Sequence, residues 1–213
     1  MSDETPKAEK PKPTPPAKPA GGAARPTPTK KEAVQVIFEL TGDPLIETLK
    51  AKFPGAIKEA QLIHNQQVIR VALESTYQVL CFLKSEADPD FNFLTDLTAV
   101  HFPDRGFEVI YQLYAMDEAR RLRVKTDVTE QDSVPSVVDL WSTANWLERE
   151  VFDLFGIRFA NHPDLRRILL PEGWEGHPLR KDYPLEYQDN QWVADHLNIL
   201  ELPVNADLTG KFE

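Results

Sequence analysis

A helix that ends at a glycine and runs into a proline-rich segment is the feature that most constrains this chain. Apolar residues spaced by four and three positions, as on one helix face, precede the glycine. They are Leu140, Ala144, Leu147, Val151 and Leu154. Gly156 follows, and glycine is the residue best suited to the left-handed position that ends a helix. Prolines then interrupt the backbone at 163, 171, 178 and 184, so this segment needs burial against its own domain or another protein.

The first 31 residues have a composition that predicts disorder. They contain eight of the eighteen prolines and no valine, isoleucine, leucine or aromatic residue, so they cannot offset the entropy cost of ordering. Seven lysines and arginines against three acids give this tail +4, and the whole chain carries −10, so the remainder carries −14. A body this acidic argues against binding nucleic acid or anionic lipid. We therefore predict a disordered, solvated tail at 1–31.

The single cysteine limits the cofactors that the chain can hold. Cys81 lies within the apolar run 79–83 and is expected to be a small core residue. A disulfide within the chain is excluded, as is a zinc or iron–sulfur site built on several cysteines. No apolar stretch resembles a secretory signal or reaches the ~18 residues of a membrane span. We therefore expect membrane contact only through a partner.

Three helices are expected from sequence periodicity and from start and stop signals. They cover 33–53 with an interruption at 42–44, 75 or 76 to 83, and 136–156 with a break at 142–143. Asp43 can cap the second part of the first helix, and Pro44 suits its first position. Ser136 suits the start of the third helix because Asp139 follows three residues later.

Strands are expected where apolar and polar residues alternate between turn formers. They cover 57–64 and 67–73, turned at 65–66, and 107–114 and 121–128 as an antiparallel pair. Residues 91–101 are compatible with helix or strand, with strand favoured at 96–100, and residues 103–106 predict a turn. The sum is an α+β fold with an antiparallel or mixed sheet and flanking helices over 32–156. Residues 157–213 are predicted to form an extended, partner-binding arm.

The acids near the end of the third helix are the strongest candidates for chemistry. Glu150 and Asp153 share a helix face, Glu148 lies nearby, and His162 could join them. Paired carboxylates can bind a metal or divide acid and base roles, as in a stand-alone hydrolase. The interleaved Arg149 points instead to ion pairing, since structural ion pairs resemble active-site clusters. No phosphate-binding glycine loop, serine elbow or H-E-x-x-H motif is present.

The proline-rich arm interleaves aromatic and basic residues. They are Trp174, Tyr183, Tyr187 and Trp192 with Arg166, Arg167, Arg180 and Lys181. Such residues either stack on single-stranded nucleic acid or anchor a protein interface, and the acidic body favours the interface. About half of them are expected to pack on their own domain. His162 and His177 each precede a proline, and we expect them to cap turns or donate to backbone carbonyls.

The stretch from Glu148 onward resembles the 30 kDa subunit family of respiratory complex I, the proton-translocating NADH–quinone oxidoreductase of bacteria. The family motif is met at every position. It stands here as Glu148-Arg149-Glu150, Asp153, His162 and Arg166-Arg167 with the intervening apolar residues, followed by the arm at 170–184. The resemblance is close over about 90–200, weaker over 33–90 and absent from the tail.

This resemblance implies a non-catalytic subunit of the peripheral arm, on the cytoplasmic side of the bacterial inner membrane. FMN, iron–sulfur clusters and quinone would be carried by other subunits, and none by this chain. The implied partners are the 49 kDa-type subunit and neighbouring iron–sulfur subunits, with no nucleic acid. Related ferredoxin-linked dehydrogenases and membrane-bound hydrogenases use similar subunits, so the electron donor stays open.

The resemblance and the residue types together predict roles for the motif. Arg149 is expected to tie the helix to neighbouring acids, and the three acids are expected to pair with Arg or Lys. Residues on the arm are expected to face the 49 kDa-type partner. They are Arg166, Arg167, Trp174, Arg180 and Tyr183, and Lys181 lies beside them.

Overall fold

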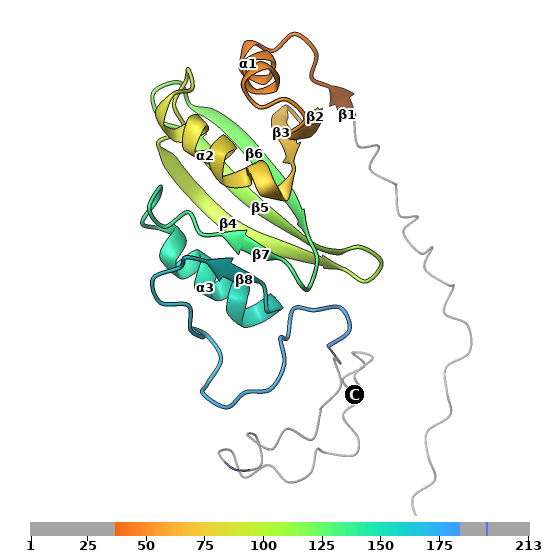
Figure 1. The fold of residues 1–213 in the computed structure, drawn as a ribbon, viewed down its shortest axis with the longest axis vertical. Helices are drawn as coiled ribbons and strands as arrows, with labels where there is room; N and C mark the ends of the chain where they lie inside the picture. Colours follow the sequence, from red (N-terminus) through yellow and green to blue (C-terminus); the bar gives the residue numbers. More distant parts are fainter. Residues whose placement is uncertain (1–36, 184–194, 196–213) are drawn as a thin grey trace, which may run out of the picture. The chain divides into compact units, whose positions relative to one another are not determined.

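A six-stranded mixed sheet carries the fold (Figure 1). It is seen in a computed structural model of the chain, which describes residues 37–183 and residue 195. The strands are β1 (Ile37–Glu39), β2 (Ile57–Ile63), β3 (Gln66–Val71), β4 (Phe93–Phe102), β5 (Gly106–Ala115) and β6 (Arg120–Val128). Their order is β1-β2-β3-β6-β5-β4, and only β3 and β6 pair in parallel. The predicted α+β class with a mixed sheet is confirmed.

Three helices and a small second sheet surround these strands (Figure 1). The helices are α1 (Pro44–Lys52), α2 (Thr76–Ser85) and α3 (Ala144–Phe155), with a 3-10 turn at Leu73–Ser75 before α2. The strands β7 (Ser133–Pro135) and β8 (Arg158–Ala160) pair in parallel on either side of α3 in the sequence. Within the described part of the chain, no helix combines the length and the apolar character that crossing a membrane requires.

Alternation along the central strands separates a buried face from a charged one. Buried side chains from β5 and β6 include Phe107, Val109, Tyr111, Leu113, Leu122 and Val124. The helices add buried leucines, isoleucines and valines to the same core cluster. On the opposite face, Glu108 accepts from Lys125 at 2.8 Å and pairs with Arg70 at 2.9 Å. The period of two predicted for these strands therefore places the core correctly.

Several local predictions are confirmed. Asp43 caps α1, because its Oδ1 accepts from the backbone N–H of Leu45 at 3.0 Å and of Ile46 at 3.3 Å, and Pro44 is the first helical residue. The predicted hairpin of β5 and β6 is antiparallel and in continuous register. Most of residues 91–101, which the sequence left compatible with helix or strand, belong to the strand β4.

Two helix predictions are wrong. Residues 37–39 form β1, which pairs with β2, where a helix was expected; residues 33–36 lie outside the described part. Helix α3 begins at Ala144, directly after the predicted break at 142–143, but the piece expected before the break, from Ser136, is not helical. The backbone N–H of Ser136 instead donates to Ala160 at 2.9 Å, so pairing with a distant strand takes precedence over local helix propensity.

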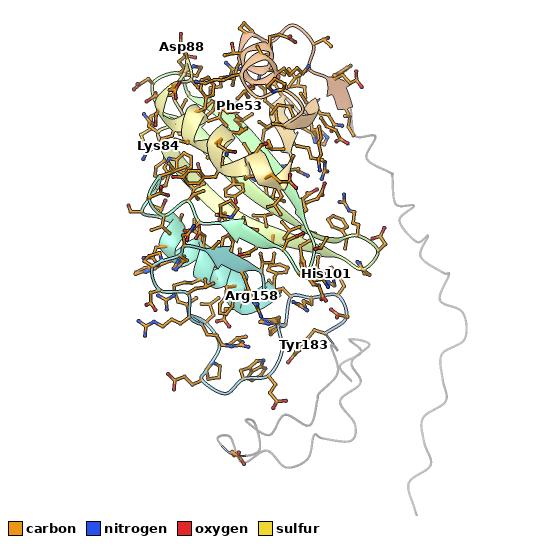
Figure 2. The ribbon with its side chains drawn as sticks, viewed as in Figure 1. Phe53, Lys84, Asp88, His101, Arg158 and Tyr183 are labelled. Carbon is orange, nitrogen blue, oxygen red and sulfur yellow. The ribbon has the colours of Figure 1, made fainter. Side chains whose placement is uncertain are left out.

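The predicted boundary at 156/157 does not mark a break in packing. Strand β8 pairs with β7, and Phe159 belongs to the buried core. At the far end of the described arm, the backbone N–H of Lys181 donates to His101 Nδ1 at 2.8 Å. Figure 2 labels His101 and the nearby Tyr183, where the described arm ends. Residues 157–183 thus lie against their own domain. The expected disorder of 1–31 and the end of the arm at 184–213 fall outside the described residues, apart from Asp195.

Replacing Asp43 should separate capping from charge. The carboxylate also pairs with Arg120 at 2.9 Å, so Asp43→Asn keeps an acceptor for the helix but loses the ion pair. Asp43→Ala loses both and should lower the free energy of unfolding by about 1 kcal/mol more than Asp43→Asn, the usual contribution of an N-cap. Urea unfolding of the two variants and the parent measures this. Equal losses would show that the cap contributes nothing.

Candidate functional site

The three acids of helix α3 lie in different environments. The side chains of Glu148 and Asp153 are fully buried at 0% exposure, whereas Glu150 is exposed. Gly156 ends the helix with φ +80°, as predicted. A Cβ there would also lie 2.6 Å from His177 Nε2, so glycine is required both by the backbone and by the approach of the arm.

Asp153 is the point at which the arm is attached to the helix. Its Oδ2 accepts from three successive backbone N–H groups, those of Ile168 at 3.0 Å, Leu169 at 2.8 Å and Leu170 at 2.9 Å. Its Oδ1 accepts from Arg167 at 3.0 Å. Burial raises the pKa of this carboxyl, but the three N–H groups and the arginine outweigh it and hold the pKa below its usual value. Asp153 is therefore a charged group held inside the fold.

The end of the arm caps the last carbonyls of α3. His177 Nδ1 donates to the carbonyl of Asp153 at 2.8 Å, and Leu179 N–H donates to Leu154 at 3.1 Å. Arg180 Nε donates to the carbonyl of Phe155 at 2.6 Å. These carbonyls have no partner within a helix, so the arm supplies the donors that the helix end requires. The predicted donation of His177 to a backbone carbonyl is confirmed.

Arg167 pairs with an acid of the helix, Asp153, as predicted, whereas Arg149 and Arg180 have partners that the sequence did not indicate. Arg149 was expected to bind acids, but it donates to the backbone carbonyls of Arg166 at 3.1 Å and Arg167 at 3.2 Å. Arg180 pairs with Glu130 at 2.9 Å, a partner that no local sequence signal indicated. Arg166 pairs with Asp164 at the surface. The two carbonyls that Arg149 binds fix the path of the arm at 166–167, and Arg166 itself stays at the surface.

The remaining arm residues lie partly at the surface. Trp174 and Tyr183 are half-buried, and Lys181 is exposed. A Cβ at Gly176 would lie 2.8 Å from Tyr183 Cε2, so the Tyr183 ring closes against a position that only glycine leaves open. The prediction was that about half of the arm's aromatic and basic residues pack on their own domain. It can be compared with the structure only for residues within 157–183, because Tyr187 and Trp192 lie outside the described residues.

Glu148 has no lysine or arginine partner among residues 37–183. Its Oε1 accepts from the backbone N–H of Val137 at 2.7 Å, while Oε2 lies 3.9 Å from His162 Nε2. His162 accepts at Nδ1 from the N–H of Asp164 at 3.0 Å and contacts the carbonyl of Asn145 through Nε2 at 3.1 Å. With Nδ1 accepting, Nε2 carries the only ring proton and the imidazole is neutral. His162 thus donates to a carbonyl, as predicted, and does not neutralise Glu148.

Burial therefore dominates the titration of Glu148. It raises the pKa of this carboxyl to about 7, and donation from Val137 and Ser136 offsets only part of the effect. The hydroxyl of Tyr111 is buried in the same region without a hydrogen-bond partner among the described residues, and burial and the nearby Glu148 raise its pKa. Close to neutral pH, Glu148 exchanges between a neutral and a charged form inside the fold.

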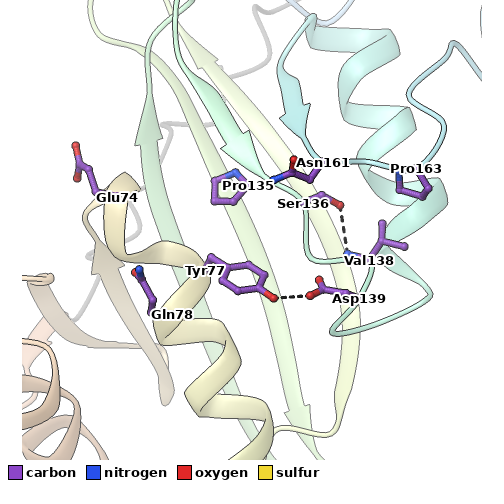
Figure 3. A pocket seen from close by; sticks show the side chains of 9 residues that line it. All are labelled: Glu74, Tyr77, Gln78, Pro135, Ser136, Val138, Asp139, Asn161 and Pro163. Carbon is purple, nitrogen blue, oxygen red and sulfur yellow. Dashed lines mark hydrogen bonds between the residues drawn. The ribbon is translucent and has the colours of Figure 1, made fainter.

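Two further features of the described residues concern the alternative of a metal or hydrolytic site. Within 37–183, no three His, Cys, Asp or Glu residues are grouped as metal ligands. A cavity of about 660 Å³ does lie between α2 and the 135–139 and 161–163 segments (Figure 3). There Tyr77 donates to Asp139, and Ser136 Oγ accepts from Val138 N–H at 3.3 Å. None of the three motif acids lines this cavity.

Asp153→Asn should release the arm. An amide cannot accept from three N–H groups and an arginine at once, so Arg167 loses its charge partner and buried donors are left unpaired. The expected loss is about 3 kcal/mol in the free energy of unfolding, with faster proteolysis between 164 and 183. Asp164→Asn, which removes the exposed partner of Arg166, is the matched control and should change neither quantity. Unchanged proteolysis in Asp153→Asn would contradict the attachment.

Glu148→Gln should remove a pH dependence of stability. The pKa of Glu148 is raised from 4.5 to about 7, so its contribution is complete below about pH 4.5 and is lost as the pH rises through 7. Relative to the variant, the parent should lose about 3 kcal/mol between pH 5 and 9. Unfolding curves across this range measure the difference. Glu150→Gln, two residues away and exposed, should run parallel to the parent; a parallel Glu148→Gln would refute the assignment.

Comparisons with known proteins agree with this fold and motif. Residues 69–189 match the family described as "Respiratory-chain NADH dehydrogenase, 30 Kd subunit". A protein of Trichlorobacter lovleyi, named as the C-type subunit of an NADH-quinone oxidoreductase, is 48% identical over 145 residues, covering 66% of this chain and 88% of that protein. A protein of the same name from Dinoroseobacter shibae is 38% identical over 160 residues, 74% of each chain.

A solved structure has the same fold. It is described as the membrane-bound sulfane sulfur reductase, an archaeal respiratory membrane complex, and one of its chains matches with a TM-score of 0.61. The match covers 79% of this chain and 96% of that chain, and at 23% identity it shows the shared fold alone. The family match spans β3 to the arm and includes every residue of the motif. This chain belongs to the family of the 30 kDa subunit of the respiratory-chain NADH dehydrogenase.

Proposed function

We propose that this chain is a non-catalytic subunit in the peripheral arm of a proton-translocating NADH–quinone oxidoreductase, on the cytoplasmic side of the bacterial inner membrane. FMN, iron–sulfur clusters and quinone would then be bound by other subunits. The family and the names of the relatives support this assignment. The single cysteine, Cys81, supports it as well, because one thiol cannot hold an iron–sulfur cluster.

The contacts of the motif residues are the main support for a non-catalytic role. Asp153 has four donors, Arg149 is bound to two carbonyls, and Glu148 faces Val137 inside the fold. Glu150, the third acid, is exposed and apart from the other two. These groups hold the arm in one path and do not converge on a common point where a substrate could react.

We further propose that the fixed arm docks on a 49 kDa-type subunit, with iron–sulfur subunits nearby. The stretch that donates to Asp153 leaves Leu169 60% exposed, and Leu179 is 49% exposed farther along. Two leucines held outward by a rigid backbone form an apolar surface at little ordering cost, which favours association with a partner. Arg166, three residues before Leu169 in the sequence, is also exposed.

The electron donor depends on the companions of the chain. Ferredoxin-linked dehydrogenases and membrane-bound hydrogenases are alternative assemblies, and a fold shared with a sulfane sulfur reductase complex does not separate them. The names of the more similar relatives favour the NADH enzyme. Mass spectrometry of the subunits that co-purify with the tagged chain from membranes distinguishes these assemblies.

Leu169→Asp should reduce assembly without reducing catalysis per complex. A carboxylate at a buried apolar contact is costly, so retention of the chain in the purified complex should fall about tenfold or more. NADH:quinone activity should fall in proportion, and activity per assembled complex should stay constant. Phe38→Asp, at an exposed aromatic residue on β1, is the control and should assemble normally. Normal assembly with lower activity per complex would contradict a non-catalytic role.

A further inference from the structure

An apolar groove lies beside the first turn of α3. Its cavity is about 370 Å³, and β4 and α3 provide its walls. The main lining residues are Phe93, Leu94, Thr95, Thr143, Trp146 and Leu147. Figure 1 shows α3 beside β4, which brings these two segments together despite their separation in sequence. Most of the groove is therefore built on two regular elements, and the turn at 142–143 completes it.

Trp146 is the most exposed of the large apolar side chains identified in the described part, at 70%. Phe93, across the groove, is 37% exposed, and Met116 in the following hairpin is 53% exposed. The inward face of α3 is filled by other residues, including Val151 and Phe155. Trp146 thus contributes little to the core, and an exposed tryptophan next to an apolar groove is typical of the centre of a protein interface.

The polar groups around the groove indicate what binds there. Glu150 lies one helical turn after Trp146 on the outer surface, and its carboxylate has no ion-pair partner within 37–183. The Oδ1 atom of Asn145, which also lines the groove, is a buried acceptor without a donor in the same part of the chain. Outside the tail, the chain carries a net charge of −14. An occupant with N–H donors and positive charge complements each of these features.

We propose that this groove receives a segment of a neighbouring subunit in which an apolar side chain stands next to a lysine or arginine. The apolar side chain packs between Trp146 and Phe93, and the cation pairs with Glu150. The inference rests on the proposed function, since it requires that the chain be part of a larger complex. It adds a second contact surface, at the first turn of α3, whereas Asp153 attaches the arm near the last turn.

Footprinting tests the proposal without any substitution. Hydroxyl radicals oxidise exposed tryptophans, and mass spectrometry identifies the oxidised residue. In the intact detergent-solubilised complex, Trp146 should be oxidised at least about tenfold more slowly than in the isolated chain, because a partner side chain covers it. Equal oxidation in a complex that contains the chain would overturn this inference and leave the proposed function standing. Absence of the chain from the complex would overturn both.

A photo-crosslinking residue at position 146 identifies the occupant. The expected product joins this position to a peptide of another subunit that contains Lys or Arg within a few residues of the crosslinked apolar side chain. A crosslink to residues 184–213 of the same chain, to a second copy or to lipid would overturn the proposal. A crosslink to a peptide of another subunit without a nearby basic residue would refute the proposed pairing with Glu150.

Substitutions measure the contribution of each side chain. Trp146→Ala should weaken retention in the complex about 30-fold, the effect of a hot-spot residue, and Trp146→Phe should restore most of it. Glu150→Lys should weaken retention by placing like charges together. Phe38→Ala and Glu118→Lys, at exposed positions elsewhere, are matched controls and should assemble normally. Because Trp146 is exposed, the isolated Trp146→Ala chain should unfold at the parental temperature; normal retention of that variant would overturn the proposal.

Discussion

The structure of the arm over 157–183 depends on the Asp153 carboxylate. A negative charge in the last turn of a helix is unfavourable, because the carbonyls there already carry partial negative charge. The arm supplies hydrogen-bond donors to both groups of oxygens. Its backbone N–H groups and Arg167 donate to the carboxylate, and His177 and Arg180 donate to the helix carbonyls. The helix end and the arm therefore stabilise each other, and neither has satisfied hydrogen bonds alone.

Glu148 lies five residues earlier on the same helix and shows the opposite behaviour. Both carboxyls are fully buried, yet the pKa of Asp153 is lowered and that of Glu148 is raised. The difference lies in their partners. Asp153 receives four donors, including a guanidinium, whereas Glu148 receives Val137 N–H and Ser136 and faces a neutral imidazole. Burial alone does not set the charge state of an acid; the number and charge of the donors decide it.

Sequence reasoning succeeded where the signal is local. The cap at Asp43, the stop at Gly156 and the alternation along β5 and β6 follow from neighbouring residues. It failed where a distant strand decides the outcome: β2 draws residues 37–39 into the sheet, and β8 holds Ser136 outside a helix. At the site, spacing located the motif residues but not their partners, since Arg149 binds carbonyls that lie 17 and 18 residues away.

Some motif residues make their contacts within the chain, and other residues are exposed. This difference changes how variants should be interpreted. Arg149, Asp153 and Arg167 act within the chain, so their loss disturbs the arm first and any partner contact second. Failed assembly in such variants is therefore no evidence that these residues touch another subunit. The isolated chain folds without burying exposed residues such as Trp146 and Leu169. Their loss should therefore affect a partner contact and leave the fold unchanged. Direct contact is best tested at these apolar positions, where folding and docking can be measured separately.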